Sequence, residues 1–542
     1  MKKVLPLFLI AIISYLAATI SCFAQNDEQL KNLFPLGEQQ LASNKVQLAL
    51  GTFQDLEKLY PANAHIQYKL GLCFLATSSR KSEAIPHLIK ATKNISQEFA
   101  EGNYKETMAP PDAIYKLAKA YHLEYVVDSA IKYYKQFKPL IPAYETELIK
   151  EVDRQVQMCE NAREIFKTPV KFSVTNLGDK INSVFDDYAA VTDAGENILI
   201  FTSRRSGGTG NMIAEDGKPY EDIYITSKNS KGQWETPENI GSTINTEGHD
   251  ASISLSADGR QLFIFRDDWG DGNIYVSKNE NDNWAEAAIM GSDINSKARE
   301  THAAVSPDGQ LLFFTSDRSG GKGGMDIYVC KKLPNGDWAL AQRLSDAVNT
   351  EYDDEAPFMH PDGKTLFFSS KGHTSIGGFD IFFTVFQEDG KWSQPKNIGY
   401  PTNTADDELF FVVSPDGKRA YYSSSKDSGL GEKDIYLINL ELEIQEPLAL
   451  YKGRIEKDAT GAIPKVSIIV TDEKAGTLYG TYRNRNDNGS FTLILKPGIT
   501  YNIAYESSGY LFHSENLTVP EGTSYFEINK AVVLEPVKLK KP

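Results

Sequence analysis

The sequence of 542 residues contains little cysteine and little histidine, and a long apolar run occurs only at its start. Its four cysteines lie far apart, so they do not form a disulfide framework. The eight histidines occur in no His-Glu-x-x-His motif and at no Cys/His spacing typical of zinc. We therefore expect no metal ion and no other cofactor, and a multi-span membrane protein is excluded.

Positive charge is also scarce, because 57 Lys and Arg face 73 Asp and Glu, for a formal net charge of -16. A nucleic-acid-binding protein needs a basic face for phosphate contacts, so that class is excluded. The hydrophobic share of 41% and the charged share of 24% are those of a globular protein and exclude wholesale disorder. The length predicts about three or four domains.

The first residues have the pattern of a signal peptide. Two lysines precede an apolar run over residues 4–20, and Ala24 then offers a small residue for cleavage. We therefore predict a signal peptide over residues 1–24 and a periplasmic protein associated with the outer membrane. A loose lipobox ends at Cys22, so lipidation at this residue is the alternative to cleavage after Ala24.

Residues 25–168 have the pattern of a helical domain, with few glycines and apolar residues at three-to-four spacing. Two units repeat one order of aromatic and small residues: Tyr68, Gly71, Phe74, Ala84 and Ala91 in the first, and Tyr115, Ala118, Tyr121, Ala130 and Tyr134 in the second. Small residues at fixed places let two helices approach closely. This order resembles tetratricopeptide (TPR) repeats, about three of them, and a plain helical bundle is the alternative.

Residues 169–446 consist of short β-type runs that alternate with turns and recur about every 50 residues. Each copy has a turn, an apolar run, a motif such as Asp326-Ile327-Tyr328, and in most copies a tryptophan strand. The turns are Ser256-Ala257-Asp258-Gly259, Ser306-Pro307-Asp308-Gly309, His360-Pro361-Asp362-Gly363 and Ser414-Pro415-Asp416-Gly417, with Thr192-Asp193-Ala194-Gly195 as a weaker first copy. Four short strands per repeat predict the blades of a β-propeller.

The number of repeats predicts five blades. The fifth copy lacks the tryptophan strand, but residues 170–178 match it, so we expect this segment to complete the last blade and close the ring. Six blades are the alternative. Residues 447–542 alternate apolar and polar side chains, as at Val466, Ile468 and Val470, and contain the turn Asn488-Gly489. They predict a small antiparallel β-sandwich.

These motifs carry family resemblances. The Ser-Pro-Asp-Gly and Asp-Ile-Tyr series resembles the PD40 (WD40-like) repeats of TolB-like propellers, and residues 447–542 resemble a carboxypeptidase regulatory-like domain. The domain order resembles that of the PorE-type periplasmic proteins of type IX secretion. That group typically continues into an OmpA-like, peptidoglycan-binding domain, for which the residues after Leu534 are too few. We therefore expect no direct binding to peptidoglycan.

Signals for catalysis are weak. The sequence has no Gly-x-Ser-x-Gly elbow, and its glycine-rich stretches lie between predicted strands, where they indicate turns and not phosphate loops. The resemblances imply a non-enzymatic scaffold that binds envelope proteins through a TPR groove and a propeller face. Membrane association would then occur only through partners or a lipidated Cys22. A glycan-binding or glycan-processing propeller protein is the alternative function.

One set of acidic residues recurs in register with the blades. Counting eight residues back from the turn aspartate, or from Ala194 in the first copy, gives Asp186, Asp250, Glu300, Asp354 and Glu408. We interpret them as a ring at the rim of the central channel and as candidate partner-binding residues. The alternative is local pairing with the cations Arg204, Arg318, Lys371 and Lys426 across each hairpin, with Asp267 and Asp268 breaking the pattern in blade two.

Overall fold

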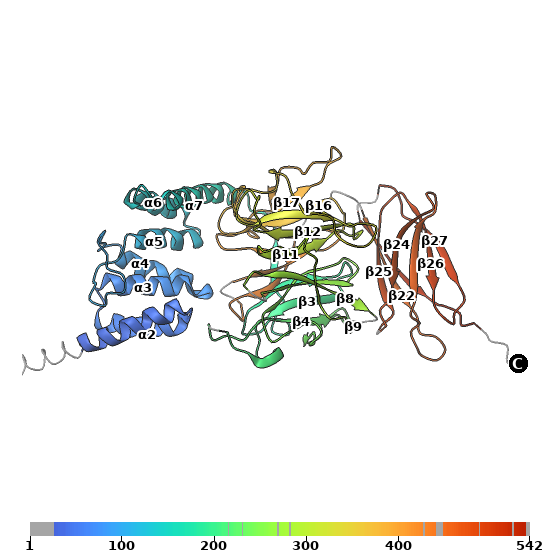
Figure 1. Cartoon of the computed structure of the whole chain (residues 1–542), viewed down its shortest axis with the longest axis horizontal. Coiled ribbons are helices and arrows are strands. Elements are labelled where there is room, and N and C mark those ends of the chain that lie inside the picture. The colour runs from blue at the N-terminus through green and yellow to red at the C-terminus, as the bar shows by residue number, and fades with distance from the viewer. Residues whose placement is uncertain are drawn as a thin grey trace, which may run out of the picture. The chain divides into compact units, whose positions relative to one another are not determined.

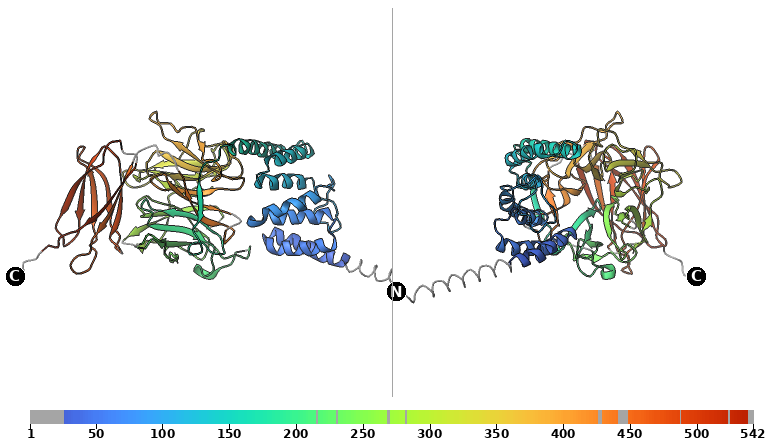
Figure 2. Two further views of the ribbon diagram at one scale, coloured as in Figure 1. Left: turned by 180° about the vertical axis from the view of Figure 1, so that it is seen from behind. Right: turned by 60° about the vertical axis from the view of Figure 1, so that its left-hand side comes forward.

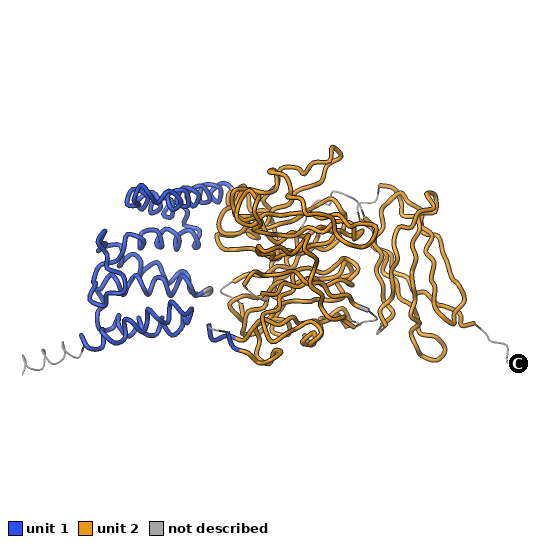
Figure 3. The backbone as a smooth tube through the Cα atoms, viewed as in Figure 1, with its two compact units in different colours: residues 1–164, 213–218 blue, residues 165–212, 219–542 orange. Residues whose placement is uncertain are grey.

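The computed structural model describes residues 26–537 except 215, 230, 268–269, 281–282, 426–428, 441–447, 487 and 523–524. The predicted signal peptide, with Cys22, lies outside these residues. The chain divides into two compact units, one of residues up to Glu164 with 213–218 and one of the remaining residues (Figure 3). No helix in the described ranges is long and apolar enough to cross a membrane.

The first unit is helical, with its helices stacked in chain order (Figures 1 and 2). Residues 26–42 are helical, and α2 and α3, α3 and α4, and α5 and α6 are packed neighbours. The bounds are α2 Val46–Leu59, α3 Ala64–Leu75, α4 Ala84–Ala91, α5 Asp112–Leu123, α6 Val127–Phe137 and α7 Thr146–Ile165, with 3-10 turns at Ser78–Glu83 and Lys138–Leu140. The predicted N-terminal helical region is therefore present.

Small residues set the spacing between these helices. A Cβ atom added at Gly71 in α3 would lie 2.5 Å from Cδ2 of Leu88 in α4, so only glycine permits this approach. Ala84 and Ala91 are fully buried in one core of the helical unit, and Ala130 and Tyr134 are fully buried in the next. The sequence pattern of small and aromatic residues thus encodes close packing of neighbouring helices.

The second unit begins with five antiparallel sheets whose innermost strands, β2, β6, β11, β15 and β19, contact one another in a closed ring. The strands are β1 Ser173–Asn176; β2 Asp187–Thr192, β3 Ile198–Ser203, β4 Asp222–Ser227, β5 Glu238–Asn239; β6 Asp250–Leu255, β7 Gln261–Arg266, β8 Asn273–Glu280, β9 Asn283–Trp284, β10 Ala288–Ile289; β11 Glu300–Val305, β12 Leu311–Ser316, β13 Asp326–Lys331, β14 Gln342–Arg343; β15 Asp354–Met359, β16 Thr365–Ser370, β17 Asp380–Val385, β18 Lys396–Asn397; β19 Leu409–Val413, β20 Arg419–Ser424 and β21 Asp434–Asn439. This arrangement is a β-propeller, as the repeats predicted.

The ring closes through its first strand. β1 pairs antiparallel with β21, with Ser173 opposite Asn439 and Asn176 opposite Tyr436, so a segment that precedes the first blade completes the last one. Asn182, just after β1, donates to the carbonyl of Ile435 in β21 and accepts from its amide. The pairing that we predicted for residues 170–178 is therefore present for residues 173–176.

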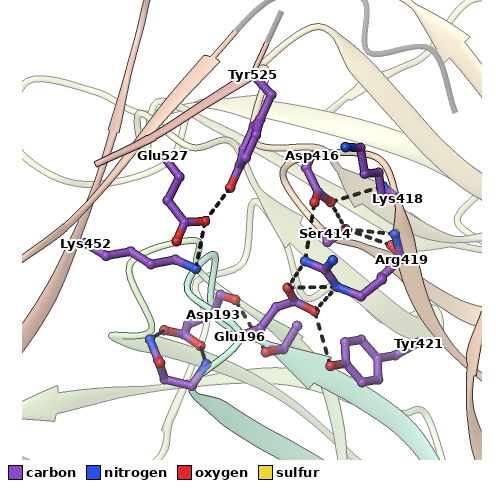
Figure 4. A network of polar contacts seen from close by, with 12 residues as sticks. Asp193, Glu196, Ser414, Asp416, Lys418, Arg419, Tyr421, Lys452, Tyr525 and Glu527 are labelled. Atoms are coloured by element: carbon purple, nitrogen blue, oxygen red, sulfur yellow. Dashed lines mark hydrogen bonds and ion pairs between the residues drawn. The ribbon is translucent and has the colours of Figure 1, made fainter. Parts of the chain in front are cut away.

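An ion pair between a buried carboxylate and a partly exposed arginine also joins the first and last blades (Figure 4). Glu196 lies in the turn between β2 and β3, and its side chain is only 8% exposed. Its Oε2 atom lies 2.5 Å from Nη2 of Arg419 in β20, and the hydroxyl of Tyr421 donates to its Oε1 atom at 3.2 Å. Because the carboxylate is removed from water, it depends on this guanidinium for compensation.

The last residues form two sheets that share one hydrophobic core, in which Ile468, Leu493 and Tyr505 are fully buried. One sheet has the order β25-β22-β28 and the other β24-β23-β26-β27. The strands are β22 Leu448–Ile455, β23 Ser467–Asp472, β24 Thr477–Arg483, β25 Ser490–Leu495, β26 Thr500–Glu506, β27 His513–Thr518 and β28 Tyr525–Val532. The predicted alternation holds, but β28 pairs parallel to β22 because the chain crosses from one sheet to the other after β27.

We predict that Arg419→Gln lowers the free energy of unfolding of the propeller by about 2 kcal/mol, because it leaves the Glu196 carboxylate buried without its partner. Lys418→Gln is the matched control, since Lys418 is the exposed neighbouring cation. Urea unfolding followed by tryptophan fluorescence measures both. Equal stabilities of the two variants would show that the ion pair does not hold the ring together.

Candidate binding site at the mouth of the propeller channel

Four of the five predicted ring acids occupy equivalent positions, and the fifth does not. Asp250, Glu300 and Asp354 begin β6, β11 and β15, and Glu408 directly precedes β19. In the first blade this position belongs to Asp187, not Asp186. The difference arises in the turn, where Glu196, at φ +52°, takes the left-handed place that Gly259 holds in the second blade. The equivalent of Asp258 is therefore Gly195 and not Ala194, and eight residues before Gly195 is Asp187.

The carboxylates at these positions are buried. Asp187, Asp250, Glu300 and Asp354 have no exposed surface, and Glu408 is 1% exposed. Each accepts hydrogen bonds from the backbone amide and the hydroxyl of the residue four positions earlier: Ser183, Thr246, Ser296, Thr350 and Thr404. They therefore organise the connection between consecutive blades instead of facing a partner.

An asparagine before each of these hydroxyl residues completes the connection. Asn245, for example, accepts from the amide of Ile223 in β4 and donates to the carbonyl of the same residue, at 2.9 Å each. Asn182, Asn295, Asn349 and Asn403 make the same pair of bonds to the third strand of their blades. The repeated Asn-Ser/Thr-x-x-x-Asp/Glu pattern is thus a structural clamp.

Cations pair with the acids in three blades. Arg205 lies 2.6 Å from Asp187, Arg266 2.5 Å from Asp250 and Arg318 3.0 Å from Glu300. Blade two was predicted to lack a cation, which is wrong, because Arg266 stands one residue before Asp267 and pairs with the acid.

The remaining predicted cations behave differently. Arg204 lies 3.7 Å from Glu221, and Lys371 contacts Asp353 and not Asp354. Lys426 and Asp268 lie outside the described residues. In blades four and five, burial raises the pKa of Asp354 to about 7 and that of Glu408 well above its usual value. In these two acids the effect of burial on the pKa outweighs that of the hydrogen bonds to the carboxylate.

A pocket opens just beyond the buried acids, on the same strands. Each innermost strand is irregular immediately after its acid, with register shifts at Tyr188/Val191, Ser252/Ser254, Glu300/Ala303, Glu355/Phe358 and Leu409/Val412. Ala189, Ala356 and Phe410 adopt left-handed φ angles of +53°, +49° and +58°. Bulges turn side chains away from the regular strand alternation, and strained backbone of this kind concentrates at functional sites.

The pocket has a volume of about 350 Å³. Its apolar wall includes Tyr188, Phe265 and Phe410, and its polar residues are Glu221, His249, Asp267, Arg299, His302 and Glu355. The side chains come from several blades, so the closed ring of strands is what brings them together. Mixed aromatic and charged linings of this size are typical of binding sites.

Each glutamate of the pocket has a histidine neighbour. Nδ1 of His302 lies 3.3 Å from Oε2 of Glu355, and the same histidine ring packs 5.1 Å from the ring of Phe410. His249 contacts Glu221 through Nδ1 and packs against Tyr220 at 4.0 Å. Burial raises the pKa of Tyr188, so its phenol stays protonated and remains a hydrogen-bond donor.

Two small cavities of about 20 Å³ each lie below this pocket, and each has space for little more than one water molecule. Both are lined by Leu255, Phe358 and Val412, and one of them also by Val191. We call the pocket at the channel mouth the socket. Among the residues that the structure describes, no cluster of three or more histidine, cysteine or acidic side chains could hold a metal ion.

Sequence reasoning did not find the socket. Tyr188, Ala251, Thr301, Glu355 and Leu409 directly follow the five buried acids, but their chemistry differs from blade to blade. The first four line the socket, and in the fifth blade the next residue, Phe410, does so. Residues that recur in every repeat indicate structural positions, and they do not identify a binding site whose residues differ between the blades. The usable signal was the position directly after each repeated acid, whatever residue occupies it.

No known protein family and no curated protein matches the sequence. Among solved structures, TolB from Acinetobacter baumannii is 14% identical, with 69% of this chain and 71% of that chain covered and a TM-score of 0.28. A protein provisionally described as TolB from Agrobacterium tumefaciens is 16% identical, with 60% and 96% covered and a TM-score of 0.30. An α-L-arabinofuranosidase from Lactobacillus brevis is 13% identical, with 50% and 95% covered and a TM-score of 0.35. The likeness to TolB-like β-propeller proteins is distant and concerns the fold alone.

We predict opposite behaviour for two of the buried acids. Asp250→Asn should cost about 3 kcal/mol, because it leaves the Arg266 guanidinium without its carboxylate. Asp354→Asn should cost less than about 1 kcal/mol at pH 8, since no cation among the described residues pairs with this carboxyl and its ionisation there is already unfavourable.

The pH dependence separates the two variants further. The Asp354 carboxyl titrates near 3.8 in the unfolded chain and near 7 in the folded one, so the folded state loses stability as the pH rises from about 4 to 7. Asp354→Asn should remove this part of the dependence, and Asp250→Asn should not. Urea unfolding followed by tryptophan fluorescence across this pH range is the measurement. An increase in stability on Asp250→Asn would contradict the interpretation of this acid as part of a structural clamp.

Proposed function

We propose that this chain is a non-enzymatic scaffold of the cell envelope, and that the socket at the channel mouth binds a segment of a protein partner. The observation that carries the proposal is the composition of the socket, in which aromatic rings lie beside charged groups from several blades. Interfaces anchor partners in this way, with a large side chain in a pocket surrounded by polar groups. A peptide segment with an apolar anchor and flanking polar groups fits this lining.

The arrangement of the acids favours binding over hydrolysis. A glycoside hydrolase needs two carboxyl groups in distinct roles, one as acid and one as base or nucleophile. In the socket, Glu355 is next to His302, and Glu221 is next to His249 and Arg204. These contacts place a basic side chain beside each carboxylate, which suits recognition of a polar partner.

The other parts of the chain fit the same role as further binding surfaces. We interpret the helical unit as TPR repeats and the C-terminal sandwich as a carboxypeptidase regulatory-like domain. The domain order and the predicted signal peptide support a periplasmic location near the outer membrane and a place in a complex of the PorE type. Solenoid grooves and propeller faces both commonly bind proteins.

We expect a photo-cross-linking residue at Arg299, on the rim of the socket, to capture one discrete envelope protein in intact cells. A cross-linker at Lys391, in the exposed outer turn of blade four, is the matched control and should not capture it. Adding Glu355→Gln to the Arg299 cross-linker should reduce capture about tenfold, because it removes the charge of the socket wall. Equal capture at both positions, or capture unaffected by Glu355→Gln, would contradict the proposal.

The glycan alternative makes a different prediction in the same protein. A glycan-processing propeller would release reducing sugar from envelope polysaccharide, and Glu355→Gln would abolish this activity. Such a result would overturn the non-enzymatic assignment.

The envelope location has its own test. N-terminal sequencing of the native protein should give Gln25 as the first residue, because cleavage after Ala24 removes the apolar run. A lipidated start at Cys22 would keep the protein in the envelope but attach it to a membrane directly. A cytoplasmic protein that starts at Met1 would contradict the envelope assignment.

A further inference from the structure

A larger cleft lies at the opposite end of the propeller, where the innermost strands run into their turns. Its volume is about 910 Å³, and it is lined by residues of the first three blades and of the sandwich, all within the second compact unit. The cleft is separate from the socket, because the socket residues stand at the start of the innermost strands and Asp258 and Gly259 of the cleft stand at their end.

The charge of the cleft is opposite to that of the chain. The formal net charge of the protein is -16, yet the cleft is lined by six cationic side chains and three acidic ones. The cations are Arg260, Lys278 and Lys332 on the propeller wall and Lys465, Arg483 and Arg485 on the sandwich wall. Because both walls contribute, the positive potential extends across the cleft and is concentrated between two surfaces of low dielectric constant.

The three acids of the cleft offset only part of this charge, and Glu506 is exposed. Asp193 is buried, and its carboxylate accepts from the amides of Asn197 and Ile198 at 2.7 and 3.1 Å, so it is turned into its own hairpin. Asp258 likewise accepts from the hydroxyl of Ser256 and the amide of Arg260. By contrast, Lys278, Lys465 and Arg483 are exposed, and within the described residues no ion pair engages them.

The rest of the lining is suited to a hydroxyl-rich ligand. Amide and hydroxyl side chains such as Asn197, Asn279, Ser467 and Ser508 lie between the cations, and Tyr482 offers a partly exposed aromatic ring. Amides and hydroxyls both donate and accept hydrogen bonds, as sugar hydroxyls do. Arginine and lysine bind carboxylate or phosphate groups through charge-assisted hydrogen bonds.

We propose that this cleft binds an acidic oligosaccharide, whose anionic groups contact the cations of both walls while its hydroxyls contact the amide and hydroxyl side chains. The spread of the cations over three blades and the sandwich matches a chain with several charges better than a single small anion. A neutral sugar would leave the cations uncompensated. An acidic peptide would supply the charge but not the hydroxyl groups.

The test uses the full chain without its predicted signal peptide and a fluorescent oligogalacturonide as probe, with binding followed by fluorescence anisotropy. We expect saturable binding that weakens with salt, and binding at least about tenfold weaker for a neutral galactan oligomer and for an oligoglutamate of equal charge. Comparable affinity for oligoglutamate would overturn the proposal in favour of an acidic peptide. Absence of saturable binding of the oligogalacturonide would overturn it as well.

Substitutions on the two walls of the cleft test whether the probe binds there. Lys278→Gln and Arg483→Gln, one from each wall, should each weaken binding about tenfold, because each removes a charge-assisted contact. Lys474→Gln is the matched control, since this exposed lysine lies in the turn between β23 and β24 and does not line the cleft. Equal effects of all three substitutions would show general charge attraction and overturn the site. Because the socket residues are unchanged in these variants, the test is independent of the proposed function.

Discussion

Closure of the ring is the constraint on which the second unit depends. β1 and β21 are more than 250 residues apart in sequence, yet their pairing makes the first and last blades neighbours, and the Glu196–Arg419 pair fixes the same junction. An open ring would leave the edge of the fifth blade unpaired and would expose the buried Glu196 carboxylate. The socket needs the same closure, because Tyr188, Glu355 and Phe410 come from blades on both sides of the junction.

The repeats encode the joints between blades. A buried acid, a hydroxyl residue four positions earlier and an asparagine next to it recur in every blade, and together they satisfy the backbone groups of the connecting loop. A buried loop needs such partners, since unpaired polar groups are costly away from water. The regular recurrence of acidic residues therefore reflects a recurring structural demand, and the functional interpretation of this pattern selected buried residues.

Much of the fold could be predicted from the sequence for the same reason. The period of the turns predicted the sheets, the match of residues 170–178 to the missing strand predicted the closing pair, and the alternation near Ile468 predicted a sandwich. The predictions that were wrong depended on the exact position of single residues. A left-handed Glu196 in place of glycine moved the first acid from Asp186 to Asp187. The hairpins also pair each acid with a residue one position earlier than we expected, so Arg266 and not Asp267 faces Asp250. Periodicity does not determine such local shifts, because a one-residue change alters the turn but not the pattern.

The candidate binding sites could not be predicted because they are made of what the blades do not share. A ring of equivalent strands carries different side chains at the same position, so Tyr188, Thr301 and Glu355 give the channel mouth a chemistry that no single repeat contains. At the other end, the turns of three blades present different cations to a cleft whose second wall is the sandwich. The repeated residues provide a rigid frame, and the two ends of that frame are free to differ in charge. The two pockets therefore differ in chemistry without conflict with the repeated contacts that hold the blades together.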